Sequence, residues 1–246
     1  MNTSLTRGQI QFIKELQQKE GRNLRGQFIV EGEKMVNELL GSSLELVGVY
    51  FTQAYELPNG IDSSLLYPIS QKDLERISAL KTPNKVLAVA KIPNNGVITS
   101  EKVIYCCNLQ DPGNAGTVSR IADWFGITDI CLTEGSVDIY SPKAVQASMG
   151  AVFRINCHYD NSEFSLLNQL KNNGYFIYAA DMEGTDLGKV DFKPKVVLVM
   201  GSESHGIIDE IRPMLNEVIT IPGAGESESL NVGVASGIIC YKLMNN

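Results

Sequence analysis

The chain has 246 residues, of which 43% are hydrophobic and 20% are charged. This balance is typical of a folded protein with one large or two small domains, and it excludes a disordered chain. No apolar stretch approaches the roughly 18 residues that a membrane helix needs, and we expect no secretory signal and no membrane association. The five cysteines are an odd number without CxxC spacing, so we expect reduced thiols, a cytoplasmic location and no metal site.

The net charge of −7 argues against a protein that holds nucleic acid by bulk electrostatics. The charges are unevenly distributed, however. Residues 1–95 carry 11 basic and 10 acidic side chains, whereas residues 96–246 carry 10 and 18. This asymmetry indicates two parts with different roles.

A cluster of turn-forming residues over 93–96, Pro-Asn-Asn-Gly, is typical of a linker. We therefore predict two domains, residues 1–96 and residues 97–246.

The first domain is predicted to be a small α/β unit. Thr6 is a candidate cap for a helix that carries Ile10, Phe12, Ile13 and Leu16 at helical spacing. Further elements are predicted as strands over 27–32, 46–52 and 85–92 and as helices over 32–40 and 71–80.

The second domain alternates apolar runs with helical segments more clearly. Strands are predicted over 103–109, 127–133, 152–157, 175–180, 196–201 and 218–223, and helices over 115–125, 142–149, 162–172 and 229–243. Strands without polar alternation are buried on both faces, which indicates a parallel sheet flanked by helices. Ligands bind such sheets at the carboxyl ends of the strands, so the loops there are the candidate site.

The first such loop lies within residues 108–126. Asp111 opens a turn, and Asn114 is a candidate N-cap for the helix that carries Arg120. Six residues are under two helical turns, so the Arg120 side chain can project back towards the loop. A capped helix with a surface arginine is the alternative.

The second loop, within residues 199–207, contains Glu203 between two glycines. A hydrolase with a G-x-S-x-G elbow at Ser204 is disfavoured, because the leading glycine is missing and no histidine follows His205.

The third loop follows the last predicted strand and opens the C-terminal helix. It approaches a dinucleotide-binding G-x-G-x-x-G pattern, but Glu228 stands where the third glycine belongs, which disfavours that function. Gly223, Ala224 and Gly225 still allow the backbone to approach a ligand closely.

Taken together, the three loops form ordered motifs: DPxNxGxxxR from Asp111, GxExxG from Gly201 and IPxxGxxESLN from Ile221. Their order and spacing resemble those of the SpoU/TrmH family of RNA 2′-O-methyltransferases. The stretch RGQFIVEGEKMVNELL, residues 25–40, resembles the substrate-recognition domain of that family. One departure is Gly233, where the family often has serine.

The resemblance implies a SPOUT-type α/β domain with a parallel sheet and a C-terminal trefoil knot, preceded by a small L30e-like RNA-binding domain. It implies an enzyme that uses S-adenosyl-L-methionine to methylate a ribose 2′-hydroxyl, with ribosomal RNA favoured over transfer RNA. Backbone at Gly201, Ile221 and Leu230 is implied to line the cofactor site. Homodimers are also implied.

Arg120 matches the essential arginine of the family. A guanidinium is a poor base but binds phosphate through two donors, so we expect it to grip the target phosphate and polarise the 2′-hydroxyl; general-base action is the alternative. Asn114, Glu203, Ser229 and Asn231 match the remaining polar motif positions and are expected to orient the ribose and Arg120.

In the first domain, basic side chains are candidates for contacts with RNA phosphates. These candidates are Arg7, Lys14, Lys19, Arg22 and Arg25. A non-catalytic RNA-binding or ribosome-assembly factor that keeps the fold is the alternative function, and a small-molecule methyltransferase is a further one.

Overall fold

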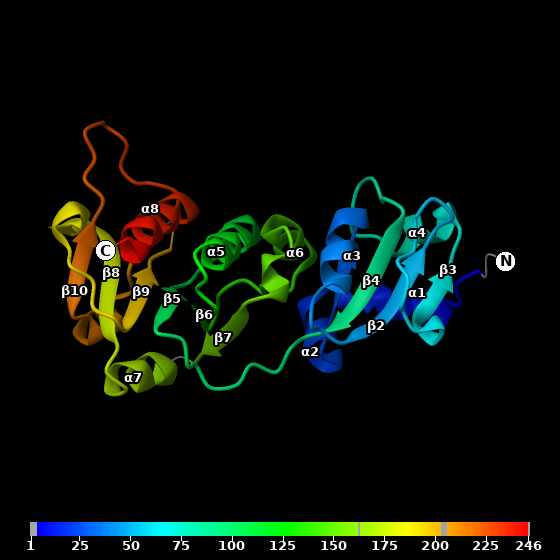
Figure 1. The fold of residues 1–246 in the computed structure, drawn as a ribbon, viewed down its shortest axis with the longest axis horizontal. Coiled ribbons are helices and arrows are strands. Elements are labelled where there is room, and N and C mark those ends of the chain that lie inside the picture. Colours follow the sequence, from blue (N-terminus) through cyan, green and yellow to red (C-terminus); the bar gives the residue numbers. More distant parts are fainter. Residues whose placement is uncertain (1–3, 162, 203–205, 246) are drawn as a thin grey trace. The chain divides into compact units, whose positions relative to one another are not determined.

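The computed structural model describes residues 4–161, 163–202 and 206–245. By their contacts, residues 1–94 and 140–153 form one compact unit, and residues 95–139 and 154–246 form a second. The segment 140–153, which the sequence-based boundary assigns to the second domain, therefore packs with the first unit. The elements of both units are labelled in Figure 1, where the colours follow the sequence.

The first unit contains a four-stranded mixed sheet. Its strands lie in the order β1 (Gln27–Glu31), β4 (Val86–Lys91), β2 (Leu46–Phe51) and β3 (Leu66–Pro68). Strand β4 is antiparallel to both neighbours, and β3 is parallel to β2. The predicted strands are confirmed, whereas β3 was not predicted.

The helices of this unit are α1 (Arg7–Leu16), α2 (Lys19–Arg25), α3 (Glu33–Leu40) and α4 (Gln71–Ile77). Thr6 caps α1 through a capping box with Gln9, as the sequence predicts for the cap. Buried Ile13 and Leu16 of α1 pack with α4 and the sheet, while Phe12 is only partly buried. Helix α2 was not predicted.

The segment that joins this unit from later in the chain contains α6 (Pro142–Ser148) and a 3₁₀ turn at Ala151–Phe153. Phe28 of β1 lies between Tyr140 and Phe153, with ring centroids 4.9 Å and 6.3 Å away. Gln146 donates a 2.6 Å hydrogen bond to the backbone oxygen of Glu31. This segment completes the core of the first unit.

The second unit contains a six-stranded sheet in which every pairing is parallel, which confirms the predicted parallel sheet of an α/β fold. Its strands lie in the order β10 (Glu217–Thr220), β8 (Phe176–Asp186), β9 (Val196–Met200), β5 (Lys102–Cys106), β6 (Asp129–Thr133) and β7 (Asn156–Asp160). The predicted strand over 152–157 is wrong in its position, because the strand begins only at Asn156.

Helices cover both faces of this sheet, which explains the apolar strands. Helix α7 (Ser165–Asn172) lies on one face, and α5 (Pro112–Trp124) and α8 (Val232–Met244) lie together on the other (Figure 1). Within the described ranges, no helix is both long enough and apolar enough to cross a membrane. The five cysteines are buried and free.

Candidate active site

The first motif folds as the start of α5. Asp111 caps the helix, because its Oδ1 accepts a 2.9 Å hydrogen bond from the backbone N–H of Asn114, and Pro112 occupies the first turn. The prediction of Asn114 as the cap is therefore wrong. Asn114 lies inside the first turn of α5.

The third motif folds as the start of α8. Asn231 caps this helix, since its Oδ1 accepts from the N–H groups of Gly233 and Val234. Its Nδ2 donates a 3.0 Å hydrogen bond to Oδ1 of Asn114. Two predicted site residues 117 positions apart in the chain are thus in direct contact.

Close packing of α5 on α8 keeps this asparagine pair in place. A Cβ atom added to Gly233 would lie 2.6 Å from Cγ2 of Thr117, and one added to Gly237 would lie 3.8 Å from Cδ1 of Ile121. The two helices therefore run side by side in the same direction. Thr117 fills the space that the missing side chain at 233 leaves.

Two of the other predicted catalytic residues, Arg120 and Ser229, are exposed. Arg120, on α5, is exposed and has no ion-pair partner within the described part of the chain. Ser229 is exposed just before the cap of α8. Glu203 lies outside the described residues.

A cavity of about 530 Å³ opens where β9 and β10 end and α8 begins, beside the middle of β8. The three residues predicted to hold the cofactor, Gly201, Ile221 and Leu230, all line it, as does Ser229. Its volume falls in the range of roughly 300–1,000 Å³ typical of small-molecule sites. The apolar part of its wall consists of Ala180, Met182, Met200, Ile219, Pro222, Val232, Ala235 and Ile239.

The described residues of the second motif, Gly201, Ser202 and Gly206, line this cavity. Ser202 and Gly206 exchange two backbone hydrogen bonds of 3.0 Å, so the chain doubles back after β9. A Cβ atom on Gly201 would lie 2.5 Å from the carbonyl carbon of Gly206. Only glycine fits at 201 in this arrangement.

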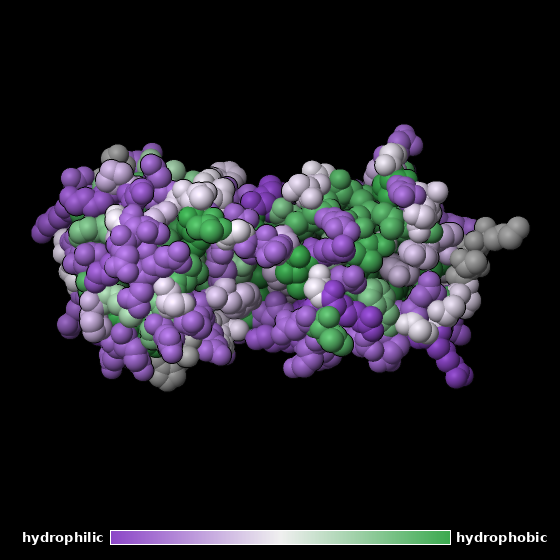
Figure 2. Space-filling view, turned by 90° about the horizontal axis from the view of Figure 1, so that it is seen from below, coloured by the Kyte–Doolittle hydropathy of each residue, from purple (hydrophilic) through white to green (hydrophobic). Residues whose placement is uncertain are grey.

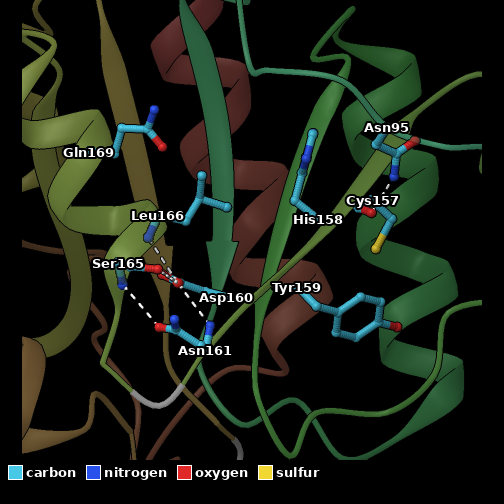
Figure 3. A pocket seen from close by; sticks show the side chains of 9 residues that line it. All are labelled: Asn95, Cys157, His158, Tyr159, Asp160, Asn161, Ser165, Leu166 and Gln169. Atoms are coloured by element: carbon cyan, nitrogen blue, oxygen red, sulfur yellow. Dashed lines mark hydrogen bonds between the residues drawn. The ribbon is translucent and has the colours of Figure 1, made fainter.

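A second cavity, of about 490 Å³, lies between β7 and α7 (Figure 3). Its carboxylate, Asp160, is already satisfied: it accepts hydrogen bonds from the Tyr105 hydroxyl and from the N–H groups of Leu166 and Leu167 at 2.9–3.0 Å. Asp160 thus anchors the start of α7. None of the predicted site residues that the structure describes lines this cavity.

The predicted RNA-contacting residues of the first unit differ in exposure. Arg7 and Lys14 are exposed on α1, and Lys19 is exposed on α2. Arg25 pairs with Glu15 at 2.6 Å and lies over the ring of Phe12. The face of this unit drawn on the right of Figure 2 mixes hydrophobic with hydrophilic residues.

The structure corrects the prediction that Arg22 is placed to contact RNA phosphates. It is only 3% exposed, and its Nη1 donates a 2.9 Å hydrogen bond to the backbone oxygen of Leu16. In this structure the side chain joins α2 to α1, and it does not face solvent where a phosphate would bind.

The residues that the structure describes contain no group of three or more His, Cys, Asp or Glu side chains placed to hold a metal ion. A parallel α/β sheet with a cavity at the carboxyl ends of its strands defines a ligand-binding α/β protein. Comparison with known proteins identifies the family within this class.

The sequence profile of the SpoU rRNA Methylase family matches residues 101–241, and that of the MRM3-like substrate binding domain matches residues 7–88. The chain therefore belongs to the SpoU rRNA methylase family, which confirms the predicted resemblance.

Individual relatives span nearly the whole chain. The 23S rRNA (guanosine(2553)-2′-O)-methyltransferase RlmP of Bacillus subtilis is 28% identical and is matched over 94% of this chain and 93% of its own. A solved structure assigned to the TrmH family, from Porphyromonas gingivalis, is 32% identical over 98% of both chains, with a TM-score of 0.87. An AdoMet-bound rRNA methyltransferase from Sinorhizobium meliloti is 27% identical over 99% of this chain and 96% of its own, with a TM-score of 0.86.

Sequence reasoning missed two residues of this region. Asp111 is the cap of α5, and the proline after it was a usable signal, because proline favours the first helical position. Asp181 lines the cavity and directly follows a predicted strand, where parallel sheets place binding residues.

Proposed function

We propose that the protein transfers a methyl group from S-adenosyl-L-methionine to a ribose 2′-hydroxyl of ribosomal RNA. Membership of the SpoU family and the AdoMet-bound relative bear out the predicted enzyme class and cofactor. The observation that carries the proposal for this chain is the contact between Asn114 and Asn231 beside a cavity lined by Gly201 and Leu230.

The cavity fits the cofactor. Glycine at 223 and 225 leaves open space, because a Cβ atom at either position would meet nothing within 4 Å. Backbone of the loop after β10 can therefore approach an adenosine closely. Apolar side chains such as Met200 and Ile239 supply contacts for its base.

The bound cofactor supplies an electrophilic methyl group. The residues of the chain have two tasks: to orient the 2′-hydroxyl in line with that methyl and to ease the loss of its proton. We assign Arg120 to the phosphate next to the target ribose, because its free guanidinium offers two parallel donors. The asparagine pair, with Ser229 and Glu203, orients the ribose.

Three structural features belong to this proposal. The loop after β10 and helix α8 form the trefoil knot, and this is supported by the cavity that those segments share with the loop after β9. Residues 1–96 form the L30e-like substrate-binding domain, and residues 140–153 pack with it. Its basic side chains Arg7, Lys14, Lys19 and Arg25 contact RNA phosphates. The protein acts in the cytoplasm.

We also infer a homodimer. Val234, Ile238 and Tyr241 lie at helical spacing on α8 and are 40–64% exposed, so they form an apolar stripe that a second copy can cover. A monomeric mass in solution at micromolar concentration, together with full activity, would refute this inference.

The test is Arg120→Ala. We expect methylation of transcribed ribosomal RNA to be lost while calorimetric binding of S-adenosyl-L-methionine is unchanged. Arg154→Ala is the matched control, because Arg154 is an exposed arginine of the same unit that is paired with Asp123. Retained turnover in the Arg120 variant would remove the assignment.

The alternative is a non-catalytic RNA-binding or ribosome-assembly factor. The intact asparagine pair and the cavity speak against it. Failure of the wild-type protein to bind S-adenosyl-L-methionine in calorimetry would favour it.

A further inference from the structure

Asp181 is the one charged side chain among the described residues that line the cofactor cavity. The other described residues of the wall are apolar, or they carry a hydroxyl group, or they are glycine or proline. The position of Asp181 is fixed by the sheet, because the preceding residue, Ala180, pairs in register with Met200 of β9. Asp181 therefore lies within β8, beside the carboxyl end of β9.

Two contacts hold this carboxylate. Its Oδ1 accepts a 2.7 Å hydrogen bond from the N–H of Met182, and its Oδ2 accepts a 3.2 Å hydrogen bond from Nη2 of Arg212. A carboxylate has about four acceptor sites, so Asp181 keeps capacity for a ligand. Its side chain is 26% exposed.

Arg212 does not fully neutralise the cluster that it forms with Asp181 and Asp209. Nε of Arg212 also donates to Oδ1 of Asp209 at 3.0 Å, so one guanidinium serves two carboxylates. The three side chains together carry one negative charge. Asp209 is 93% exposed and does not line the cavity, whereas Asp181 does.

We infer that Asp181 makes the cavity prefer the positively charged methyl donor over its demethylated product. The inference rests on the proposed location of the cofactor. When the methyl group moves to the ribose oxygen, the sulfur keeps the electron pair of the broken S–CH₃ bond and loses its positive charge, and the hydroxyl proton is released. A carboxylate in a partly apolar wall attracts the cation before transfer and loses that attraction afterwards. The same residue thus favours donor binding and product release.

The test compares Asp181→Asn with Asp209→Asn by calorimetry, using S-adenosylmethionine and S-adenosylhomocysteine as ligands. Asp181→Asn is expected to weaken binding of the charged donor roughly three- to tenfold, as for one charge in an intermediate dielectric, and to change product binding less than twofold. Asp209→Asn removes the same charge from the same arginine, and we expect neither affinity to change more than twofold. Thermal unfolding of both variants checks that the fold is retained.

Three results would overturn the role of Asp181. An equal loss for both ligands would mean that the carboxylate bonds to a group they share, such as a ribose hydroxyl. No loss, or the same loss in the Asp209 variant, would mean that the cavity does not sense this charge. Separately, Ala235→Trp fills the cavity; if it leaves both affinities unchanged, the proposed location of the cofactor is itself wrong.

Discussion

The two units organise their sheets differently, and the difference explains where the chemistry lies. In the second unit all six strands are parallel, so the segments after β9 and β10 reach the same edge and line one cavity together with the middle of β8. In the first unit β4 is antiparallel to both neighbours, so the strand ends are divided between two edges. A parallel sheet gathers loops from distant parts of the sequence, and a mixed sheet does not.

The units also differ in how their core is completed. Residues 140–153 lie within the part of the chain that matches the SpoU family, but they pack in the first unit. Its stability therefore depends on a segment that lies more than 40 residues beyond its last strand.

The largest expected effect is on the stability of the first unit and concerns residues 140–153. Phe153→Ala removes a buried ring that packs near Phe28, and such truncations cost about 3–5 kcal/mol. We expect the first unit to unfold at lower urea concentration. Hydrogen exchange in β1 reports the first unit, and hydrogen exchange in β5 reports the second unit separately. Equal protection of β1 in the variant and the wild type would contradict the packing role.

The next prediction concerns cofactor affinity and compares a glycine of the second unit, Gly201, with one of the first, Gly48. Gly201→Ala places a methyl group against the backbone of Gly206, so the cavity wall must move. We expect cofactor affinity to fall by roughly 3 kcal/mol, or about a hundredfold.

Gly48→Ala in the first unit is the matched control for this glycine. Its added methyl would lie 3.0 Å from the edge of the Tyr67 ring, a side chain that can shift. Cofactor affinity should stay unchanged there. Calorimetry measures the cofactor affinity of both variants. An unchanged affinity in the Gly201 variant would show that the cavity wall can move to accommodate the methyl group.

These contrasts also show how far sequence reasoning reaches. Most strands of both sheets were predictable, because continuous apolar runs mark strands that are buried on both faces, whereas the short, half-buried edge strand β3 was not. The same signal fails at Val152 and Phe153. These residues are apolar because they fill the core of the first unit from a 3₁₀ turn, and a local pattern does not distinguish the two situations.

Polar contacts between distant residues were beyond the sequence. The sequence of α2, KEGRNLR, gives no apolar stripe, and its position depends on the buried bond from Arg22 to Leu16. The motifs identified Asn114 and Asn231 as site residues. Their hydrogen bond appears only once α5 and α8 pack together.

A smaller effect is a difference in acid response between buried carboxylates. Burial alone would raise the pKa of Asp129, but hydrogen bonds from His158, Thr128 and Asn156 outweigh it and lower the pKa to about 2. The unfolded state then binds more protons, so about 2 kcal/mol of stability is present above pH 4 and is lost as the pH falls through about 2. Asp129→Asn should remove this dependence.

The pKa of Glu31, in the first unit, shifts in the opposite direction. Burial raises its pKa above the ordinary 4.5, despite hydrogen bonds from Ser78 and Ala79. The native state then binds more protons, so its contribution is present below pH 4.5 and is lost as the pH rises through the raised value. Urea unfolding of the wild type and of Glu31→Gln between pH 3 and 7 measures this slope. The same sign for both carboxylates would contradict the comparison.

The smallest effect separates a helix cap from a site contact. Thr6 and Asn231 cap α1 and α8, and truncation of either to alanine should cost about 1 kcal/mol of stability. Asn231→Ser keeps a good capping residue but removes the donor to Asn114. We expect its stability to stay close to that of the wild type, while turnover falls about fivefold, as for one lost hydrogen bond of about 1 kcal/mol. Thr6→Ala should show the reverse, with lower stability and unchanged turnover of the folded protein. If Asn231→Ser kept full turnover, the asparagine pair would be a structural link between two helices, and the site would have to depend on Arg120 and the cavity alone.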